Sequence, residues 1–283
     1  MLAIITDSTC DIHDNLIREY GIIVISHFIL WGDKEYRDRV NLQPGTFYQM
    51  LGTNPIRPTT AQAGVSDFLA GIQQAIENGA TEALILTVSS AMSGAYDMAG
   101  QAADQAEIPV TVIDSKGPTM SLGWQVLAAA RARDAGLSKN EILAKVDDVR
   151  GKMVQIVAME TLEYLQTGGR IGEAAKWVGS LLNVRPVISI NHTKGVVTPA
   201  GLARSHKSAV KMLYKKFFDA VGDGNKLHIA VLHGNALEEA QKLVERIREE
   251  FDPVELIVNI TGPVLGINTG PGALALCGYA DGD

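Results

Sequence analysis

The chain has 283 residues, of which 46% are hydrophobic and 20% charged, and its formal net charge is −7. This length and composition allow a sizeable buried core, arranged as one large domain or two compact ones. The negative charge counts against a general nucleic-acid binder, because such proteins gain affinity mainly by neutralising phosphates. We therefore expect no nucleic-acid partner.

Cysteine and histidine spacing argues against disulfides and metal. The only cysteines, Cys10 and Cys277, stand beside apolar runs, so we expect small core residues. The six histidines show no metal-ligand spacing, and no metal is predicted.

The short apolar run after Met1 meets Asp7 at once, unlike a signal peptide, and no stretch reaches the roughly 18 uncharged apolar residues of a membrane helix. These features predict a cytoplasmic protein without a transmembrane segment.

The first half of the chain alternates strand and helix patterns. Short apolar runs predict strands at Leu2–Thr6, Ile22–Ser26, Ala83–Val88 and Val110–Ile113. Apolar residues at helical spacing predict a helix from Ile12 to Tyr20 and another from Phe68 to Ile76, with Ser66 available as N-cap of the second. Strands that are apolar on both faces and alternate with helices predict a mainly parallel sheet with helices on both faces.

The second half is richer in strand patterns. Strands are predicted at Val154–Met159, Val184–Ile190, Gly195–Leu202, Leu227–His233 and Val254–Ile260, with a hairpin turn at Asn191–Lys194. Helices are predicted from about Ser205 and over the stripe that starts at Leu237. We predict an α/β protein of two domains, an N-terminal domain of residues 1–155 and a C-terminal domain of residues 156–283 with a mixed sheet, and residues 57–80 can pack with the second. Since no Gly/Ser/Pro-rich linker separates them, we expect a ligand site between the two.

Polar residues follow the opening strand at Thr6-Asp7-Ser8-Thr9, the edge where α/β sheets usually bind ligands. An aspartyl-phosphate phosphatase would need Asp-x-Asp-x-Thr, but the second aspartate here is Asp11. We favour the alternative that Asp7 hydrogen-bonds the loop and caps the next helix.

Three serines precede a helix predicted at Ala95–Gln105. Ser93 stands at the expected N-cap, where a hydroxyl and free N–H groups favour an anion, and Gly94 allows close approach. A capping serine with no ligand is an equal alternative. Ser93 is not flanked as Gly-x-Ser-x-Gly, so a serine hydrolase is weakly supported.

Further polar segments are less specific. Arg57–Gln62 resembles an ordinary turn, Thr167–Gly172 a flexible turn that presents Arg170, and Thr261–Gly272 a tightly shaped loop. The chain has no P-loop or Gly-x-Gly-x-x-Gly unit, so no nucleotide cofactor is predicted. Arg204, Lys207, Lys211 and Lys215 share one helix face. That face is either solvated or binds an acidic partner.

Taken together, the segments resemble the DegV family of bacterial fatty-acid-binding proteins. The matching segments, in order, are Thr6–Thr9, Thr59–Gln62, Ser89–Gly94, Val112–Lys116, Leu165–Ile171 and Gly262–Gly272, which span nearly the full chain. The resemblance implies a non-catalytic carrier that holds one long-chain fatty acid in a buried tunnel, with no cofactor. It also implies, in some members, a separate ATP-dependent kinase that phosphorylates the carboxylate to an acyl phosphate for phospholipid synthesis.

The resemblance also implies which residues bind the carboxylate. They are Ser93 with the threonine pair, most of all Thr60, together with Thr59, Gly94 and Asn268. The family commonly has histidine where this chain has Asn268, and asparagine supplies a hydrogen bond but no positive charge. Arg170, Arg204 and Lys207 match a kinase-docking surface. The alternative function is a small-molecule phosphatase or acyl hydrolase that uses Asp7 or Ser93.

Overall fold

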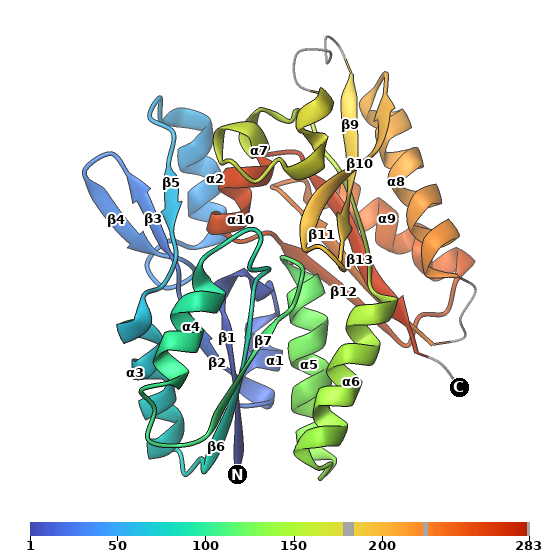
Figure 1. Ribbon diagram of the computed structural model, residues 1–283. Coiled ribbons are helices and arrows are strands. Elements are labelled where there is room, and N and C mark those ends of the chain that lie inside the picture. The colour runs from blue at the N-terminus through green and yellow to red at the C-terminus, as the bar shows by residue number, and fades with distance from the viewer. Residues whose placement is uncertain (178–183, 223–225, 282–283) are drawn as a thin grey trace.

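The described strands form three sheets in the computed structural model, which describes residues 1–177, 184–222 and 226–281 (Figure 1). The first sheet is entirely parallel, in the order β2-β1-β6-β7. Its strands are β1 (Leu2–Asp7), β2 (Ile23–Ile25), β6 (Glu82–Thr87) and β7 (Val110–Asp114). The α/β class with a parallel N-terminal sheet is confirmed.

Helices cover both faces of this sheet. α3 (Val65–Glu77) and α4 (Ala95–Ala103) pack together over β1, β2, β6 and β7, whereas α5 (Met120–Asp134) contacts β1 and β6 from the other face. The short α1 (Asp14–Glu19) joins β1 to β2. The predicted N-cap of α3 is wrong. Ser66 lies inside the helix and Gly64 is the N-cap, because the Asp67 carboxylate accepts the N–H of Gly64.

The second sheet has six strands in the order β10-β9-β8-β13-β11-β12, and its only parallel pair is β11 with β12. Its strands are β8 (Val154–Ala158), β9 (Arg185–Asn191), β10 (Val196–Ala203), β11 (Leu227–His233), β12 (Glu255–Ile260) and β13 (Leu274–Ala280). The mixed sheet and the β9–β10 hairpin are confirmed. α8 (His206–Val221) and α9 (Leu237–Glu250) pack on this sheet on the side away from α5 (Figure 1).

Several elements were not predicted. A small antiparallel sheet contains β3 (Phe28–Trp31), β4 (Lys34–Arg37) and β5 (Thr59–Ala61), with α2 (Pro44–Thr53) between β4 and β5. The interpretation of Arg57–Gln62 as a plain turn is therefore wrong. The predicted C-terminal loop contains α10 (Pro263–Thr269). α6 (Lys139–Lys152) packs on α5, while η1 (Ser8–Cys10), α7 (Glu163–Thr167) and η2 (Gly172–Trp177) are short.

α5 packs against both the parallel sheet and the six-stranded sheet. α5 contacts β1 and β6 on one side and β13 on the other, and α6 also contacts β13. The predicted boundary at residue 155 stays a prediction. Cys10 and Cys277 are buried free thiols, as expected. Among the described helices, none combines the length and apolar character needed to cross a bilayer.

Candidate functional site

An apolar cavity lies between the carboxyl end of the parallel sheet and the six-stranded sheet. Val88, directly after β6, lines it from the first sheet, and Val157, Ile188 and Val197 line it from β8, β9 and β10. In α/β folds the carboxyl ends of parallel strands are the usual place for ligands. Walls of this kind favour a ligand with a large apolar surface.

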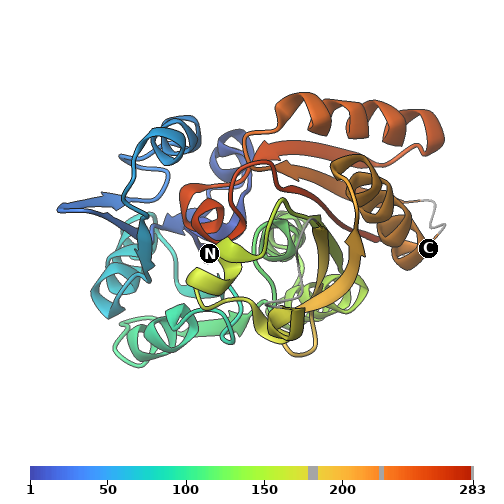
Figure 2. The ribbon, with the colours of Figure 1, turned by 90° about the horizontal axis from the view of Figure 1, so that it is seen from above.

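The cavity opens through a polar mouth beside α7 and α10. Thr60, Arg170 and Asn268 line both the cavity and a second, outer pocket, so they stand where the two meet. The outer pocket is also lined by Arg57 and Thr59. Seen from above, α7 and α10 lie side by side near the middle of the molecule (Figure 2). Because Thr60 and Asn268 both line it, the mouth is built from segments more than 200 residues apart in the sequence.

The structure brings three of the predicted carboxylate residues to this cavity. Thr60 comes from β5, Ser93 from the loop before α4, and Asn268 from α10. Thr59 is exposed in the outer pocket. Gly94 is close to Gln62, since a β-carbon at position 94 would lie 3.1 Å from the Gln62 amide nitrogen. Their roles as carboxylate ligands stay predictions.

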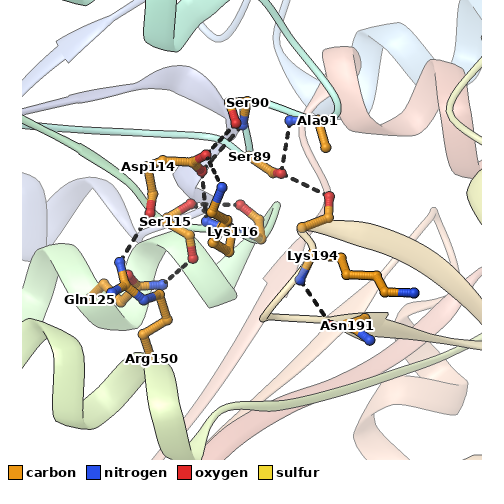
Figure 3. A network of polar contacts seen from close by, with 12 residues as sticks. Ser89, Ser90, Ala91, Asp114, Ser115, Lys116, Gln125, Arg150, Asn191 and Lys194 are labelled. Atoms are coloured by element: carbon orange, nitrogen blue, oxygen red, sulfur yellow. Dashed lines mark hydrogen bonds and ion pairs between the residues drawn. The ribbon is translucent and has the colours of Figure 1, made fainter.

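The three serines before α4 have different partners, and Figure 3 shows those of Ser89 and Ser90. Ser89 is buried and donates to the carbonyl of Gly195 in the β9–β10 turn, 2.8 Å away. Ser90 donates to the Asp114 carboxylate. Only Ser93 lines the cavity. The N-cap of α4 is Gly94 rather than Ser93, although the Ser93 hydroxyl oxygen accepts the N–H of Ala95 at 3.2 Å.

Asn268 is held by its own helix and by a glycine. Its Nδ2 donates to the Val264 carbonyl, 2.9 Å away, which leaves one amide hydrogen for another acceptor. A β-carbon on Gly168 would lie 2.1 Å from Asn268 Oδ1. Only glycine at position 168 therefore allows α7 to end against Asn268.

Arg170 spans the mouth from the turn after α7. Its Nε donates to the Met92 carbonyl, 3.0 Å away, and its Nη1 donates to the Gly168 carbonyl at 2.5 Å. The first bond ties the turn to the loop that carries Ser93. Arg170 therefore places a cation at the opening where Asn268 is neutral.

The Asp7 carboxylate is bound on both oxygens by neighbouring groups of the protein. It is fully buried, its Oδ1 accepts the N–H and the hydroxyl of Thr9, and its Oδ2 accepts the N–H of Val88 at 2.7 Å. Burial opposes ionisation, but the neighbouring His27 and these hydrogen bonds outweigh it and hold the pKa of the Asp7 carboxyl below its usual value. Both oxygens are thus occupied in fixing the loop after β1, which agrees with the favoured structural interpretation.

His27 is a cavity residue that the sequence analysis missed. It is 3% exposed, its Nδ1 accepts the N–H of Ala63 at 3.0 Å, and its Nε2 lies 3.5 Å from Asp7 Oδ1. Its ring lines the cavity. Its position directly after the predicted strand Ile22–Ser26, at a carboxyl end, is the signal that could have indicated it.

Comparison with known proteins identifies the family of the chain. The family model described as the DegV family matches residues 1–281. The chain belongs to the DegV family.

Relatives of the DegV family match over nearly the whole chain. A DegV domain-containing protein of Deinococcus radiodurans is 31% identical, with 97% of this chain and 94% of the relative covered. The solved DegV family protein of Thermus thermophilus, described by its fatty-acid binding, is 29% identical, with a TM-score of 0.90 and 99% of each chain covered. DegV of Bacillus subtilis, described as a fatty-acid-binding protein, is 26% identical, with the same TM-score and coverage.

Lys207, Lys211 and Lys215 lie on α8, whereas Arg204 lies before the N-cap Ser205, so the prediction that all four share one helix face is wrong for Arg204. Arg204, Lys207 and Lys211 are exposed, and Lys215 pairs with Asp219 at 2.6 Å. Arg204 and Lys207 line neither the cavity nor the outer pocket. In the described ranges no three His, Cys, Asp or Glu side chains gather as a metal site would require.

Proposed function

We propose that the protein binds one long-chain fatty acid, with its hydrocarbon chain in the cavity and its carboxylate at the mouth. The observation that carries this proposal is the change from apolar walls, such as Val157 and Ile188, to polar side chains where the cavity opens. The two solved relatives described as fatty-acid-binding support it. The protein is then a cytoplasmic carrier and not itself an enzyme.

The balance of free energies favours such a ligand. Burying about fourteen methylene groups at roughly 0.8 kcal/mol each gives an upper limit of about 11 kcal/mol. Burying the carboxylate costs several kcal/mol unless donors satisfy it. The hydroxyls of Thr60 and Ser93 and the second amide hydrogen of Asn268 are the proposed donors. The Ser93 hydroxyl oxygen accepts the N–H of Ala95 through a lone pair, which leaves the O–H hydrogen available for the carboxylate.

Arg170 supplies the positive charge at this head-group site. Since Asn268 is neutral, the guanidinium of Arg170 is the cation that lines both the cavity and its mouth. Thr59 completes the outer side, and Gly94 keeps the loop close enough for Ser93 to reach the carboxylate.

Native mass spectrometry tests the ligand. Protein purified from a bacterial host is expected to carry a one-to-one mass increment that organic extraction identifies as a long-chain fatty acid. The double variant Thr60→Ala, Ser93→Ala should bind added fatty acid at least tenfold more weakly, because two donors to a buried carboxylate are lost. Ser90→Ala is the matched control, since Ser90 belongs to the same loop but faces Asp114. A chain of bare polypeptide mass that takes up no fatty acid contradicts the proposal.

We further propose that a separate ATP-dependent fatty-acid kinase uses the bound ligand and phosphorylates its carboxylate to an acyl phosphate for phospholipid synthesis. The support is the exposed position of Arg204 and Lys207 beside the start of α8. Glu160 links this end of α8 to the chain before α7, because it accepts from His206 at 2.7 Å and from Arg185 at 2.8 Å.

Charge reversal tests the kinase partner. The variant Arg204→Glu, Lys207→Glu should lower acyl-phosphate formation by the host's fatty-acid kinase at least tenfold, while fatty-acid affinity, measured separately, stays within twofold. Lys215→Glu, on the same helix but already beside Asp219, is the control. Full acyl-phosphate formation by the double variant excludes this surface.

A further inference from the structure

The six-stranded sheet contributes its part of the cavity wall in rows of side chains. Val157 on β8 pairs with Ile188 on β9, and both line the cavity in one row. Two residues further along these strands, Gln155 and Ile190 line it in a second row, where Ile190 pairs with Val197 of β10. Because β8 runs toward α7, which stands at the mouth, the second row lies about 7 Å deeper than the first.

The next row lies outside the cavity. Met153 and His192, two residues further again, line a separate groove on the surface and not the cavity. Asp114, Lys116 and Arg150 also border this side groove, and Figure 3 shows these three residues. The cavity therefore ends between the second row and the third.

Ile190 stands at this boundary. Among the residues that the structure describes, it alone lines both the cavity and the side groove. It is 8% exposed. At this point one apolar side chain thus separates the inner end of the cavity from the side groove.

Beside Ile190 the wall is closed by polar groups that bond to one another. Gln155 Nε2 donates to the Thr119 hydroxyl oxygen at 3.0 Å, and Gln155 Oε1 accepts from Ser121. Ser121 Oγ also lies 2.8 Å from His192 Nε2. A hydrocarbon chain that pushed through here would leave buried polar groups unpaired, whereas at Ile190 it would meet only an apolar side chain.

We propose that Ile190 closes the inner end of the cavity and sets the upper chain length of the bound fatty acid, whose terminal methyl group packs against it. This inference rests on the proposed function, because a carboxylate at the mouth directs the other end of the chain toward the second row. Each methylene group that fits inside the cavity raises the affinity about fourfold. Once the chain has reached Ile190, further methylene groups gain nothing.

Two substitutions at position 190 move this end in opposite directions. Ile190→Ala removes three carbon atoms and opens the cavity into the side groove, so that longer chains can pass. Ile190→Phe fills more of the inner end and shortens the cavity. Ile188→Ala is the matched control, because Ile188 is the same residue type on the same strand and lines the cavity but not the side groove.

Delipidated protein is incubated with an equimolar mixture of laurate, myristate, palmitate, stearate, arachidate and behenate. Native mass spectrometry gives the relative occupancy of each acid, and thermal unfolding checks the fold of each variant. Ile190→Ala should raise the occupancy of behenate relative to palmitate about tenfold, and Ile190→Phe should lower that of stearate relative to myristate about tenfold. In Ile188→Ala both ratios should stay within about twofold of wild type, because that change weakens all of the long acids alike.

The inference is overturned if Ile190→Ala keeps the wild-type ratio of behenate to palmitate, or if Ile188→Ala shifts this ratio as much as Ile190→Ala does. If Ile190→Phe does not fold, the Ile190→Ala ratio decides alone. A wild-type protein that takes up none of these acids instead refutes the proposed function.

Discussion

The contact between Gly168 and Asn268 determines how closely α7 approaches the head-group site. Gly168 has an ordinary helical φ of −73°, so its backbone conformation does not require glycine. What requires glycine is the amide oxygen of Asn268, 2.1 Å from where a β-carbon would lie. A side chain at position 168 must therefore displace either Asn268 or the end of α7.

We expect Gly168→Ala to weaken fatty-acid binding about fivefold or more, because the displaced amide no longer reaches the carboxylate. The affinity is measured by fluorescence displacement. In the Asn268→Ala background the same change should cost little further affinity, since the clashing oxygen is gone. Equal losses in both backgrounds would show that Gly168 acts independently of Asn268.

At the scale of elements, a strand or helix can be predicted from the sequence where its buried residues leave a regular apolar pattern. β1 and β6 could be predicted within one or two residues because they are apolar on both faces and bounded by polar residues. β5 could not, because Thr59–Ala61 becomes a strand only by pairing with β3. α5 gives no amphipathic stripe, since 12 of its 15 residues are buried.

The residues of the candidate site likewise form two groups: those that the sequence indicates and those that only the tertiary structure places. Ser93 and Asn268 belong to segments that a single sequence marks through polar residues and glycines near strand and helix ends. The hydrogen bonds of Arg170 and the position of His27 in the cavity wall depend on tertiary packing. Local sequence reasoning therefore finds the loops of the site but not which side chains face one another.

The close packing of α5 leads to a prediction about the stability of this helix. A β-carbon on Gly123 would lie 2.5 Å from the Cys10 carbonyl oxygen and 2.7 Å from the sulfur of Met120. Gly123→Ala should lower the free energy of unfolding by about 1–3 kcal/mol through overpacking, despite the better helix propensity of alanine. Gly100→Ala in α4, where nothing lies within 4 Å, should instead raise it by about 0.5–1 kcal/mol. Urea unfolding measures both; a stabilised Gly123→Ala variant would contradict the packing argument.

At the scale of the whole molecule, an ion pair joins α5 to the six-stranded sheet. Arg131 near the end of α5 donates to both oxygens of Glu255 on β12, at 2.9 and 2.8 Å, and His228 on β11 lies 3.1 Å from the same carboxylate. Burial opposes ionisation of Glu255, but the hydrogen bonds and charges of His228 and Arg131 outweigh it and lower its pKa from 4.5 to about 2. α5 and the six-stranded sheet are thus linked by a carboxylate that stays ionised in moderate acid.

The lowered pKa of Glu255 gives stability a defined acid dependence. The folded pKa lies below the unfolded value, so the stabilisation is complete above about pH 4.5 and is lost as the pH falls toward 2. Glu255→Gln should therefore cost about 1–3 kcal/mol of unfolding free energy at pH 7, and the difference from wild type should shrink by pH 3. Urea unfolding at pH 7, 5 and 3 measures this, with Glu245→Gln on the exposed face of α9 as control. A difference that is the same at pH 7 and pH 3 would show that the carboxylate charge is not what joins α5 to β12.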